Sequence, residues 1–297
     1  MDLAAQYGTK PGVHPMRKSN AASLFAGLAA AVAAGGALAQ DAEGKPVPQG
    51  TGFQPAVTEL MRDIVWFDNF LHILAIAITI FVCVLLLICI VRYNKRANPT
   101  PARFTHHALL EVVWTGVPIV ILVVVGAFSV PILFKQLYVP QADITIKAIG
   151  NQWNWDYEYP DHEIDFNATM IRDRADLADA GYAEDEYLLA TDEVVVLPVN
   201  KNIHVLVTGS DVIHAWTVPA FGVKVDAIPG RMNELWFKAE QTGTYFGQCS
   251  ELCGLEHSYM PITVKVVSEE EFNDWVNQKR ADAGLDPMGA VKVAAAE

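Results

Sequence analysis

Two long uncharged segments constrain the fold of this 297-residue chain more than any other feature. The first is residues 70–91, FLHILAIAITIFVCVLLLICIV, in which His72 is the one basic side chain. The second is residues 112–134, VVWTGVPIVILVVVGAFSVPILF, which contain no charged residue. At about 1.5 Å of rise per residue, a helix of either length crosses the roughly 30 Å hydrocarbon core of a bilayer. Pro118 and Pro131 are compatible with this because membrane helices tolerate proline. The sequence therefore predicts a transmembrane helical hairpin at residues 63–137.

A third apolar stretch, near the N-terminus, has the pattern of a signal peptide. The segment MRKSNAASLFAGLAAAVAAGGALAQ begins with basic residues, continues with an alanine-rich run and ends with small residues at Ala37 and Ala39. That order is typical of a cleaved export signal, and an uncleaved anchor is the alternative. We predict a signal peptide over residues 1–39, for which Met16 is a better start than Met1.

The loop between the two membrane segments predicts their orientation. It carries Arg92, Lys95, Arg96 and Arg103, with no acidic residue between positions 92 and 107. Loops rich in lysine and arginine stay on the cytoplasmic side of a membrane. Both outer ends of the hairpin, and the large C-terminal segment with them, are therefore expected in the bacterial periplasm or its equivalent.

The C-terminal segment also carries the negative charge of the chain. The whole sequence has a net charge of −13, and from Lys135 onward it has 12 Lys and Arg against 27 Asp and Glu. Such a surface attracts basic proteins and repels polyphosphate backbones. The charge therefore favours a basic protein partner and argues against nucleic acid.

The C-terminal segment has the pattern of an all-β domain. Short β-branched or aromatic runs, separated by Gly, Pro, Asn or Asp, predict strands at residues 142–150, 153–159, 193–200, 202–209, 214–219, 233–240, 242–249 and 261–267. A helix-sized apolar period interrupts them at residues 172–189. We predict a Greek-key sandwich over residues 138–268, preceded by an irregular exported segment at 40–62 and followed by an acidic helix and tail at 269–297.

One short stretch, GQCSELCGLEHSYMP at residues 247–261, concentrates side chains that bind metals. Its spacing is Cys249-x3-Cys253-x3-His257-x2-Met260, and a further histidine, His214, lies beside a turn in SDVIHAWTVP. In an oxidising compartment the two cysteines could form a disulfide, but that leaves the histidines and the methionine unexplained. Two cysteines and two histidines could also form a closed zinc site, which does not need the methionine.

Copper is the metal that this donor set favours. Thiolate, thioether and imidazole are soft ligands that suit copper, although a single copper ion needs only one thiolate. Two thiolates can bridge two copper ions, with one histidine on each metal and weaker axial ligands from Met260 and the backbone carbonyl of Glu251. The disulfide and the zinc site remain open alternatives, because a motif is a hypothesis until its structural context agrees.

Four sequence features together resemble subunit II of the cytochrome c oxidases, over residues 53–267. They are GQCSELCGLEHSYMP, DVIHAWTVPAFGVKVDAIPGR, WNWDYEY after AIG, and a helical hairpin containing PARFTHHALLEVVWTGVP. The resemblance implies a cupredoxin-like sandwich and a magnesium ion, shared with subunit I, that the Glu251 side chain reaches. It also implies a binuclear copper centre, termed CuA, held by His214, Cys249, the Glu251 carbonyl, Cys253, His257 and Met260.

The same resemblance implies a function in respiration. Cytochrome c would deliver electrons through Trp153 to the copper pair, and the electrons would continue to subunit I, where oxygen is reduced and protons are pumped, in a complex that also contains subunit III. Asp165, Asp192 and Asp211 would attract cytochrome c. Glu111 would mark the cytoplasmic mouth of a proton pathway, although its position at a helix N-terminus also explains a carboxylate there.

Two residues depart from the family pattern, and two other functions remain possible on the sequence alone. Asn151 stands where the family usually has an aromatic residue or histidine, and Asn154 where tyrosine is common, so the detail of the docking surface is open. A membrane-anchored copper carrier would bind copper exchangeably and lack a fixed partner for its hairpin. A fragment of a nitrous-oxide reductase, which uses a similar copper domain, would need a large additional catalytic domain.

Overall fold

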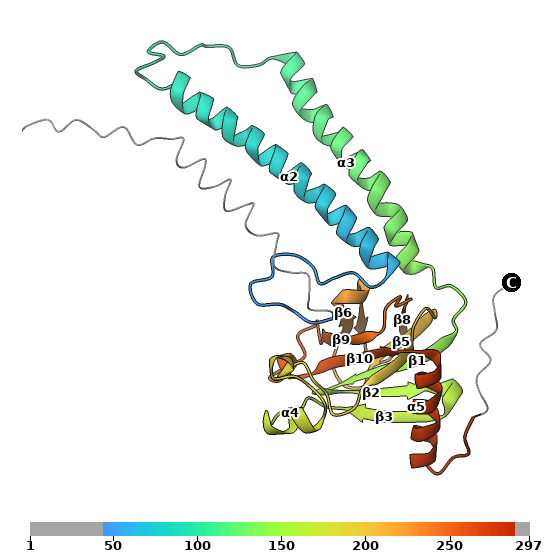
Figure 1. Ribbon diagram of the computed structural model, residues 1–297. Coiled ribbons are helices and arrows are strands. Elements are labelled where there is room, and N and C mark those ends of the chain that lie inside the picture. The colour runs from blue at the N-terminus through green and yellow to red at the C-terminus, as the bar shows by residue number, and fades with distance from the viewer. Residues whose placement is uncertain (1–43, 289–297) are drawn as a thin grey trace, which may run out of the picture. The chain divides into compact units, whose positions relative to one another are not determined.

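The structure is a computed structural model, and it describes residues 44–288 (Figure 1). The predicted signal peptide and the last nine residues lie outside this part. The helices are α2 (Glu59–Arg92), α3 (Ala108–Leu137), α4 (Ala175–Asp179) and α5 (Glu269–Asp282). The strands are β1 (Ile144–Asn151), β2 (Asn154–Tyr159), β3 (Ile164–Ala168), β4 (Val195–Pro198), β5 (Ile203–Gly209), β6 (His214–Val218), β7 (Val223–Ala227), β8 (Asn233–Phe237), β9 (Gly243–Gln248) and β10 (Pro261–Val267).

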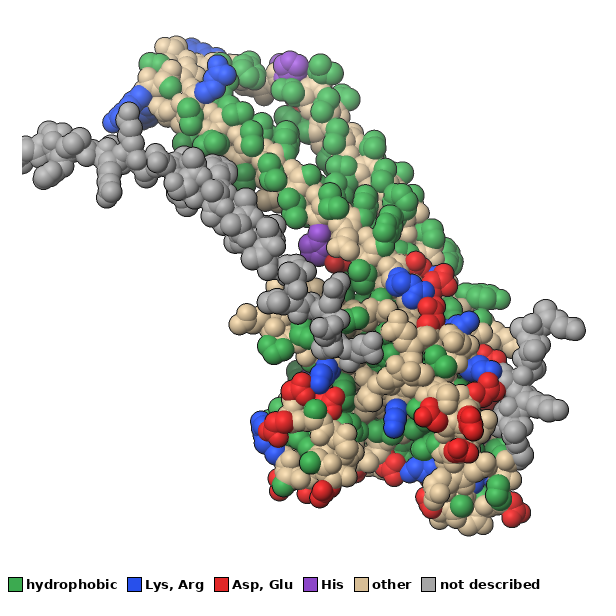
Figure 2. All heavy atoms as spheres, viewed as in Figure 1, with side chains coloured by type: hydrophobic (Ala, Val, Ile, Leu, Met, Phe, Trp, Pro, Cys, Tyr) green, Lys and Arg blue, Asp and Glu red, His purple; other side chains and the backbone are tan. Residues whose placement is uncertain are grey.

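The helices α2 and α3 form the predicted hairpin. Both are long and apolar enough to cross a membrane, and hydrophobic side chains cover the surface of both (Figure 2). Pro118 and Pro131 lie inside α3 and do not interrupt it. At the base of the hairpin, Nζ of Lys135 lies 2.6 Å from Oε1 of Glu59 and 2.7 Å from Oδ2 of Asp63. This cluster joins the end of α3 to the start of α2.

The helix α2 begins at Glu59, four residues before the predicted start of the hairpin. Thr58 caps it, because its Oγ1 accepts a hydrogen bond from the backbone N of Met61 at 3.0 Å. The same hydroxyl donates to the carbonyl O of Phe221 at 2.8 Å, and Leu60 and Met61 are buried. The first turn of α2 therefore packs against the β domain, a contact that apolar length alone does not predict.

Strands β1 to β10 form sheets of five, three and two strands, with the orders β3-β2-β1-β5-β8, β4-β10-β9 and β6-β7. The pairs β1–β5 and β4–β10 are parallel, and the remaining pairs are antiparallel. Buried and partly exposed residues alternate along β1 and β5, as in sheets with one face on the core. Large side chains fill that core, among them Trp155, Tyr157, Trp216, Phe221 and Phe237.

Two strands and one loop differ from the sequence-based expectation. Strands β3 and β7 were not predicted, and each is the second arm of a hairpin that turns through a short 3-10 helix, at Pro160–His162 and Pro219–Phe221. The expected helix at residues 172–189 is reduced to the five residues of α4 and a 3-10 turn. Helix α4 and this 3-10 turn lie in residues 169–192, in the connection between β3 and β4, and this segment is named here the acidic lobe.

Candidate metal centre

The end of one hairpin brings most of the predicted metal ligands together. Cys249 directly follows β9 and Met260 directly precedes β10, and these two strands pair in an antiparallel register that ends with Gln248 opposite Pro261. The backbone N of Cys249 donates to the carbonyl O of Met260 at 3.2 Å, which closes the loop at its base. We call residues 249–260 the metal loop. His214, the first residue of β6, lies against it and is fully buried.

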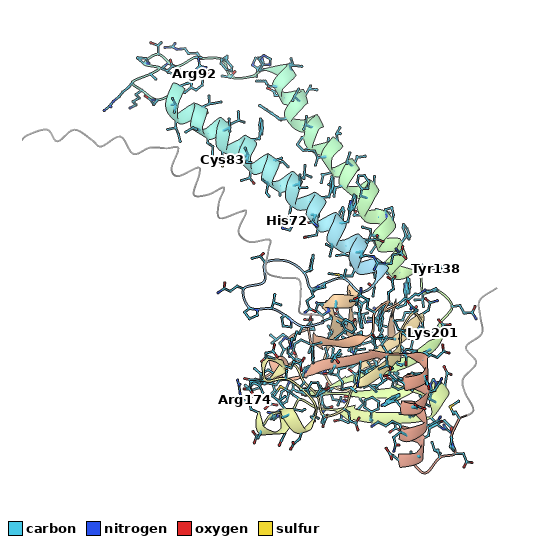
Figure 3. The ribbon with its side chains drawn as sticks, in the orientation of Figure 1. His72, Cys83, Arg92, Tyr138, Arg174 and Lys201 are labelled. Carbon is cyan, nitrogen blue, oxygen red and sulfur yellow. The ribbon has the colours of Figure 1, made fainter. Side chains whose placement is uncertain are left out.

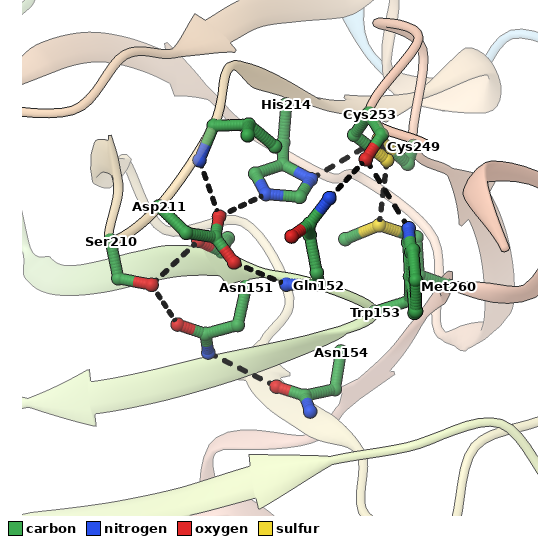
Figure 4. Close-up of polar contacts among 12 residues, drawn as sticks. Asn151, Gln152, Trp153, Asn154, Ser210, Asp211, His214, Cys249, Cys253 and Met260 are labelled. Carbon is green, nitrogen blue, oxygen red and sulfur yellow. Dashed lines mark hydrogen bonds and ion pairs between the residues drawn. The ribbon is translucent and has the colours of Figure 1, made fainter. Parts of the chain in front are cut away.

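The sulfur atoms lie at the centre of the site (Figure 4). The Sγ atoms of Cys249 and Cys253 are 3.8 Å apart. Nδ1 of His214 lies 3.9 Å from Sγ of Cys249, and Nδ1 of His257 lies 3.5 Å from Sγ of Cys253. Sδ of Met260 is 3.5 Å from Sγ of Cys253. Each cysteine sulfur therefore has one imidazole nitrogen of its own beside it.

Two glycines make room for this arrangement. A Cβ atom on Gly150 of β1 would lie 2.9 Å from ring atoms of His214. A Cβ atom on Gly247 of β9 would lie 1.9 Å from the carbonyl O of Thr217, on the strand that carries His214. Real Cβ contacts are not this short, so glycine at both positions allows β6 and its histidine to approach the metal loop.

Asp211 fixes the orientation of the His214 ring. Its Oδ1 accepts a hydrogen bond from Nε2 of His214 at 2.8 Å, and its carboxylate also accepts from the backbone N of Gln152 and of Val212. Burial raises the pKa of Asp211, but these hydrogen bonds outweigh it and leave the pKa lowered. Because the carboxylate holds Nε2, Nδ1 is the ring nitrogen that faces Cys249 and that a metal ion would bind, the arrangement of a metal-binding histidine with an outer carboxylate.

The two thiols hold their protons unequally. Burial raises the pKa of Cys249, but hydrogen bonds with His214 and with the backbone at Glu251 and Ala215 outweigh it and lower this pKa to about 6. Burial and the negative charge of Cys249 raise the pKa of Cys253 to about 12. Ionisation of Cys249 therefore opposes ionisation of Cys253. A metal ion that binds both sulfurs must displace the second proton.

The turn between β1 and β2 packs against the metal loop. The carbonyl O of Cys253 accepts hydrogen bonds from Nε2 of Gln152 at 2.7 Å and from Nε1 of Trp153 at 3.3 Å. Trp155 is fully buried, and its Nε1 donates to the carbonyl O of Met260 at 3.4 Å. Trp155 is thus part of the core, whereas Trp153 is partly exposed at the edge of the site.

The geometry bears on the alternatives left open by the sequence. A disulfide needs an S–S length of about 2.05 Å, so the two sulfurs 3.8 Å apart are not bonded. His214, Cys249 and Cys253 place their ligand atoms within 4.8 Å of one another, and His257 does not join this group at that distance. A tetrahedral zinc site would need all four around one ion. The arrangement fits metal bound between the two sulfurs, with one histidine at each end.

Comparison with known proteins agrees with this picture. The family described as cytochrome c oxidase subunit II, periplasmic domain, matches residues 144–267, and the transmembrane domain of the same subunit matches residues 46–132. The chain is 53% identical over 282 residues to cytochrome c oxidase subunit 2 of Cereibacter sphaeroides, covering 90% of this chain and 93% of the relative. It is 44% identical over 236 residues to a probable subunit 2 of Rickettsia bellii, covering 79% and 86%.

The chain belongs to the cytochrome c oxidase subunit II family. It is therefore a subunit of a cytochrome c oxidase, with two membrane helices and a periplasmic domain, and the predicted hairpin followed by a cupredoxin-like sandwich is confirmed. A crystal structure of the periplasmic domain of subunit II from Bradyrhizobium japonicum is 51% identical and covers 49% of this chain and 99% of its own, with a TM-score of 0.44.

The structure places the other predicted site residues of this subunit II in different surroundings. Asp165 is exposed on β3, away from the metal loop. Asp192 joins the two ends of the acidic lobe, because its carboxylate accepts hydrogen bonds from N and Oγ1 of Thr169 at 2.7 and 2.6 Å. Glu111, in the first turn of α3, accepts from the backbone N of His107 at 3.2 Å, which is a capping contact.

Sequence reasoning missed two residues that contact the site and assigned a different role to a third. Gln152 binds the Cys253 carbonyl, and Arg172 of the acidic lobe forms an ion pair with Glu256 of the metal loop. Asp211 was predicted to attract a partner protein, and the structure shows it hydrogen-bonded to His214, one of the predicted metal ligands. The spacing of Asp211 and His214, three residues apart beside a turn, is a signal that could have indicated the contact.

Proposed function

We propose that this subunit II accepts electrons from cytochrome c at a binuclear copper centre and passes them to the heme and copper centres of subunit I. The observation that carries the proposal is that each cysteine sulfur has two further donors beside it. Next to Cys249 are Nδ1 of His214 at 3.9 Å and the carbonyl O of Glu251 at 3.4 Å. These three donors suit one copper ion.

The other cysteine has an equivalent set of neighbours. Next to Cys253 are Nδ1 of His257 and Sδ of Met260, both 3.5 Å from the sulfur. A thioether beside thiolate and imidazole is a copper donor set and has no use in a zinc site. The two sulfurs, 3.8 Å apart, are close enough for a metal ion to contact both, because a metal–thiolate bond is about 2.3 Å long.

The protein residues supply rigidity and exclude water. A copper pair held by these residues would supply a centre that takes up and gives back one electron. His214, Cys249, Cys253 and Met260 are all buried, so water has little access to the ligand atoms. All six donors come from a strand end or from the loop closed by paired strands, and Asp211 holds one imidazole in place. A ligand set that moves little when its charge changes is suited to rapid electron transfer.

Trp153 is the residue through which we propose that electrons enter. It is partly exposed, and its indole Nε1 contacts the backbone of a cysteine ligand. An acidic domain attracts the basic face of cytochrome c and raises the association rate, an effect that weakens with ionic strength. Asp165, Asp192 and Asp211 are the proposed docking acids, and the last two also have the structural contacts described above.

Further roles follow from membership of the oxidase and remain proposals. We propose that the side chain of Glu251, which is exposed, binds a magnesium ion shared with subunit I. Glu111 is proposed to open a proton pathway on the cytoplasmic side, in addition to its capping contact. Subunits I and III are the proposed neighbours of α2 and α3 in the membrane, and residues 1–39 are proposed to be removed on export.

Electron transfer into the assembled oxidase tests the proposed function. Reduced cytochrome c is mixed with oxidase containing this subunit, and heme reduction is followed by stopped-flow spectroscopy at low ionic strength. Trp153→Phe should slow heme reduction at least tenfold while the copper content stays the same. Trp275→Phe, a change in a partly buried tryptophan of α5, is the matched control and should have no effect. Equal rates for both variants would contradict entry of electrons through Trp153.

A further inference from the structure

An ion pair connects the acidic lobe with the metal loop. Nη2 of Arg172 lies 2.5 Å from Oε2 of Glu256, and Nη1 of the same guanidinium lies 3.4 Å from Oε1. Both oxygens of one carboxylate thus face both terminal nitrogens of one guanidinium, the geometry that makes arginine a directional partner for carboxylates. Glu256 directly precedes His257, so whatever holds Glu256 also acts on that imidazole.

The outer part of the metal loop has few other attachments. Leu252 and Leu255 are 78% and 90% exposed, so they do not anchor the loop to the rest of residues 44–288. The inner carbonyl of Cys253 is held by the β1–β2 turn, and that of Ser258 by Gln248. Within the described part of the chain, residues 254–257 have one hydrogen-bonding partner outside the metal loop. Among residues 44–288, the hydrogen bonds and the ion pair that reach this segment from outside the loop are those of Arg172.

Hydrogen bonds and a small buried core within the acidic lobe hold the backbone at Arg172. The backbone N of Ile171 donates to the carbonyl O of Ala190 at 3.0 Å, and the hydroxyl of Tyr187 donates to the carbonyl O of Arg172 at 3.2 Å. Ile171, Leu177 and Ala190 form a small buried core of their own. These hydrogen bonds and this small core therefore hold the backbone from which the Arg172 guanidinium extends.

We propose that Arg172 is a positioning residue for the copper site, and that it holds the His257 arm of the metal loop through Glu256. This inference rests on the proposed copper centre. The pair is partly exposed, with side-chain exposures of 60% and 32%, and exposed ion pairs change an equilibrium by at most about fivefold. The expected effect is therefore an adjustment of His257 relative to Cys253, with the rest of the site intact.

The pair also places two opposite charges near the metal. Removal of the Glu256 carboxylate leaves a guanidinium beside the site, which favours the reduced metal and raises the reduction potential. Removal of the Arg172 guanidinium leaves a carboxylate and lowers the potential. A purely structural loosening would shift the potential in the same direction for both changes. The opposite signs are thus a readout that distinguishes an ion pair from general packing.

The test uses the full-length chain, first without metal and then in the assembled oxidase. Hydrogen exchange of the metal-free chain should show amides of residues 254–257 exchanging two- to fivefold faster in Arg172→Gln and in Glu256→Gln. The exchanged pair, Arg172→Glu with Glu256→Arg, should return exchange to the wild-type rate. In the oxidase, the potential of the copper centre should fall in Arg172→Gln, rise in Glu256→Gln and return toward the wild-type value in the exchanged pair.

Arg174→Gln is the matched control. Arg174 lies in the same lobe (Figure 3), pairs with Glu184 and lies 4.1 Å from the centroid of the Tyr187 ring. Its loss therefore tests loosening of the lobe without loss of the ion pair to Glu256, and exchange and potential should change much less than in Arg172→Gln. If Arg172→Gln behaves like this control, or the exchanged pair fails to restore exchange, the positioning role is wrong. A wild-type chain that binds no copper pair would instead contradict the proposed function, and the metal-free exchange data distinguish the two failures.

Discussion

The two halves of the metal site are built by different means. The half around Cys249 and His214 comes from strand ends, with the imidazole buried, flanked by Gly150 and fixed by Asp211. The half around Cys253 and His257 comes from an excursion between two strands, and side chains from elsewhere hold it at its ends. We call the first half sheet-held, because strands position its ligand residues, and the second half tethered, because contacts with side chains elsewhere position it. Substitutions in the two halves should therefore have different effects.

The largest effect is expected from Cys249→Ser in the sheet-held half. A serine hydroxyl is a poor ligand for a soft metal, so the copper pair should be lost while the β domain stays folded. Copper content per chain and the electron paramagnetic resonance spectrum measure this. Cys83→Ser, on the exposed surface of α2, is the control and should keep the wild-type spectrum. A normal copper pair in Cys249→Ser would contradict the bridging role.

Asp211→Ala should weaken copper binding without preventing it. The His214 ring loses the carboxylate that fixes its orientation, and loss of such an outer partner costs about 10- to 100-fold in metal affinity. Competition with a chelator measures the affinity. Asp165→Ala, an exposed acid of β3, should leave the affinity unchanged. Equal affinities for the two variants would mean that the sheet orients His214 without the carboxylate.

Gly150→Ala should destabilise the domain from the same half. The new methyl group would overlap the His214 ring, and overpacking of this kind costs about 1–3 kcal/mol. The free energy of unfolding of the chain in detergent measures the change. Gly52→Ala places a methyl group where no atom lies within 4 Å and should be neutral. A neutral result at Gly150 would show that His214 can move away freely.

Met260→Leu tests the tethered half with a change that conserves volume. The fold and most of the copper should remain, because an axial ligand adjusts a copper site without holding it, and the reduction potential should shift. Potentiometric titration of the copper centre measures the shift. If the variant loses both copper ions, Met260 holds the metal and the axial assignment is wrong.

The dependence of stability on pH is a smaller expected effect, and it comes from His162, which belongs to neither half of the site. Burial lowers the pKa of His162, and Arg280 lowers it further against the opposing charge of Asp161. The folded protein therefore binds this proton less readily than the unfolded chain, whose histidine pKa is about 6.5. Stability contributed by the neutral ring is present above about pH 6.5 and decreases as the pH falls below it.

Unfolding measured between pH 7.5 and 5.5 tests the role of His162. His162→Phe should give a flatter dependence of stability on pH, since phenylalanine packs against Tyr159 and Phe272 without titrating. Copper content should stay at the wild-type level, which separates general stability from the two halves of the site. An unchanged slope in the variant would assign the pH dependence to other groups.

The sequence indicates the candidate donors of the site more directly than it indicates the residues that support them. The ligand types and their spacing within residues 249–260 are local, so a single stretch indicates them. The contact of Asp211 with Gln152 spans 59 residues, and that of Arg172 with Glu256 spans 84, so neither can be inferred without the fold. For this reason Asp192 and Asp211 were predicted only as docking acids, although both make specific hydrogen bonds within the domain.

The fold shows the same division between local and distant information. The membrane hairpin and eight strands follow from apolar runs and alternation, which are local signals. Strands β3 and β7 were missed although IDFNA and VKVDA alternate apolar and polar residues, so both carried a local signal directly after a short turn. The start of α2 was placed too late because Thr58 and Leu60 are held by the β domain, which lies far along the chain.

The copper stoichiometry and electron paramagnetic resonance spectrum of the full-length wild-type chain test the central claim most directly. If the sheet-held and tethered halves each contribute one imidazole to a shared, thiolate-bridged pair, the chain binds two copper ions that share one unpaired electron, with hyperfine splitting from both nuclei. A single copper ion with splitting from one nucleus, or tightly bound zinc in its place, would contradict the account of the site.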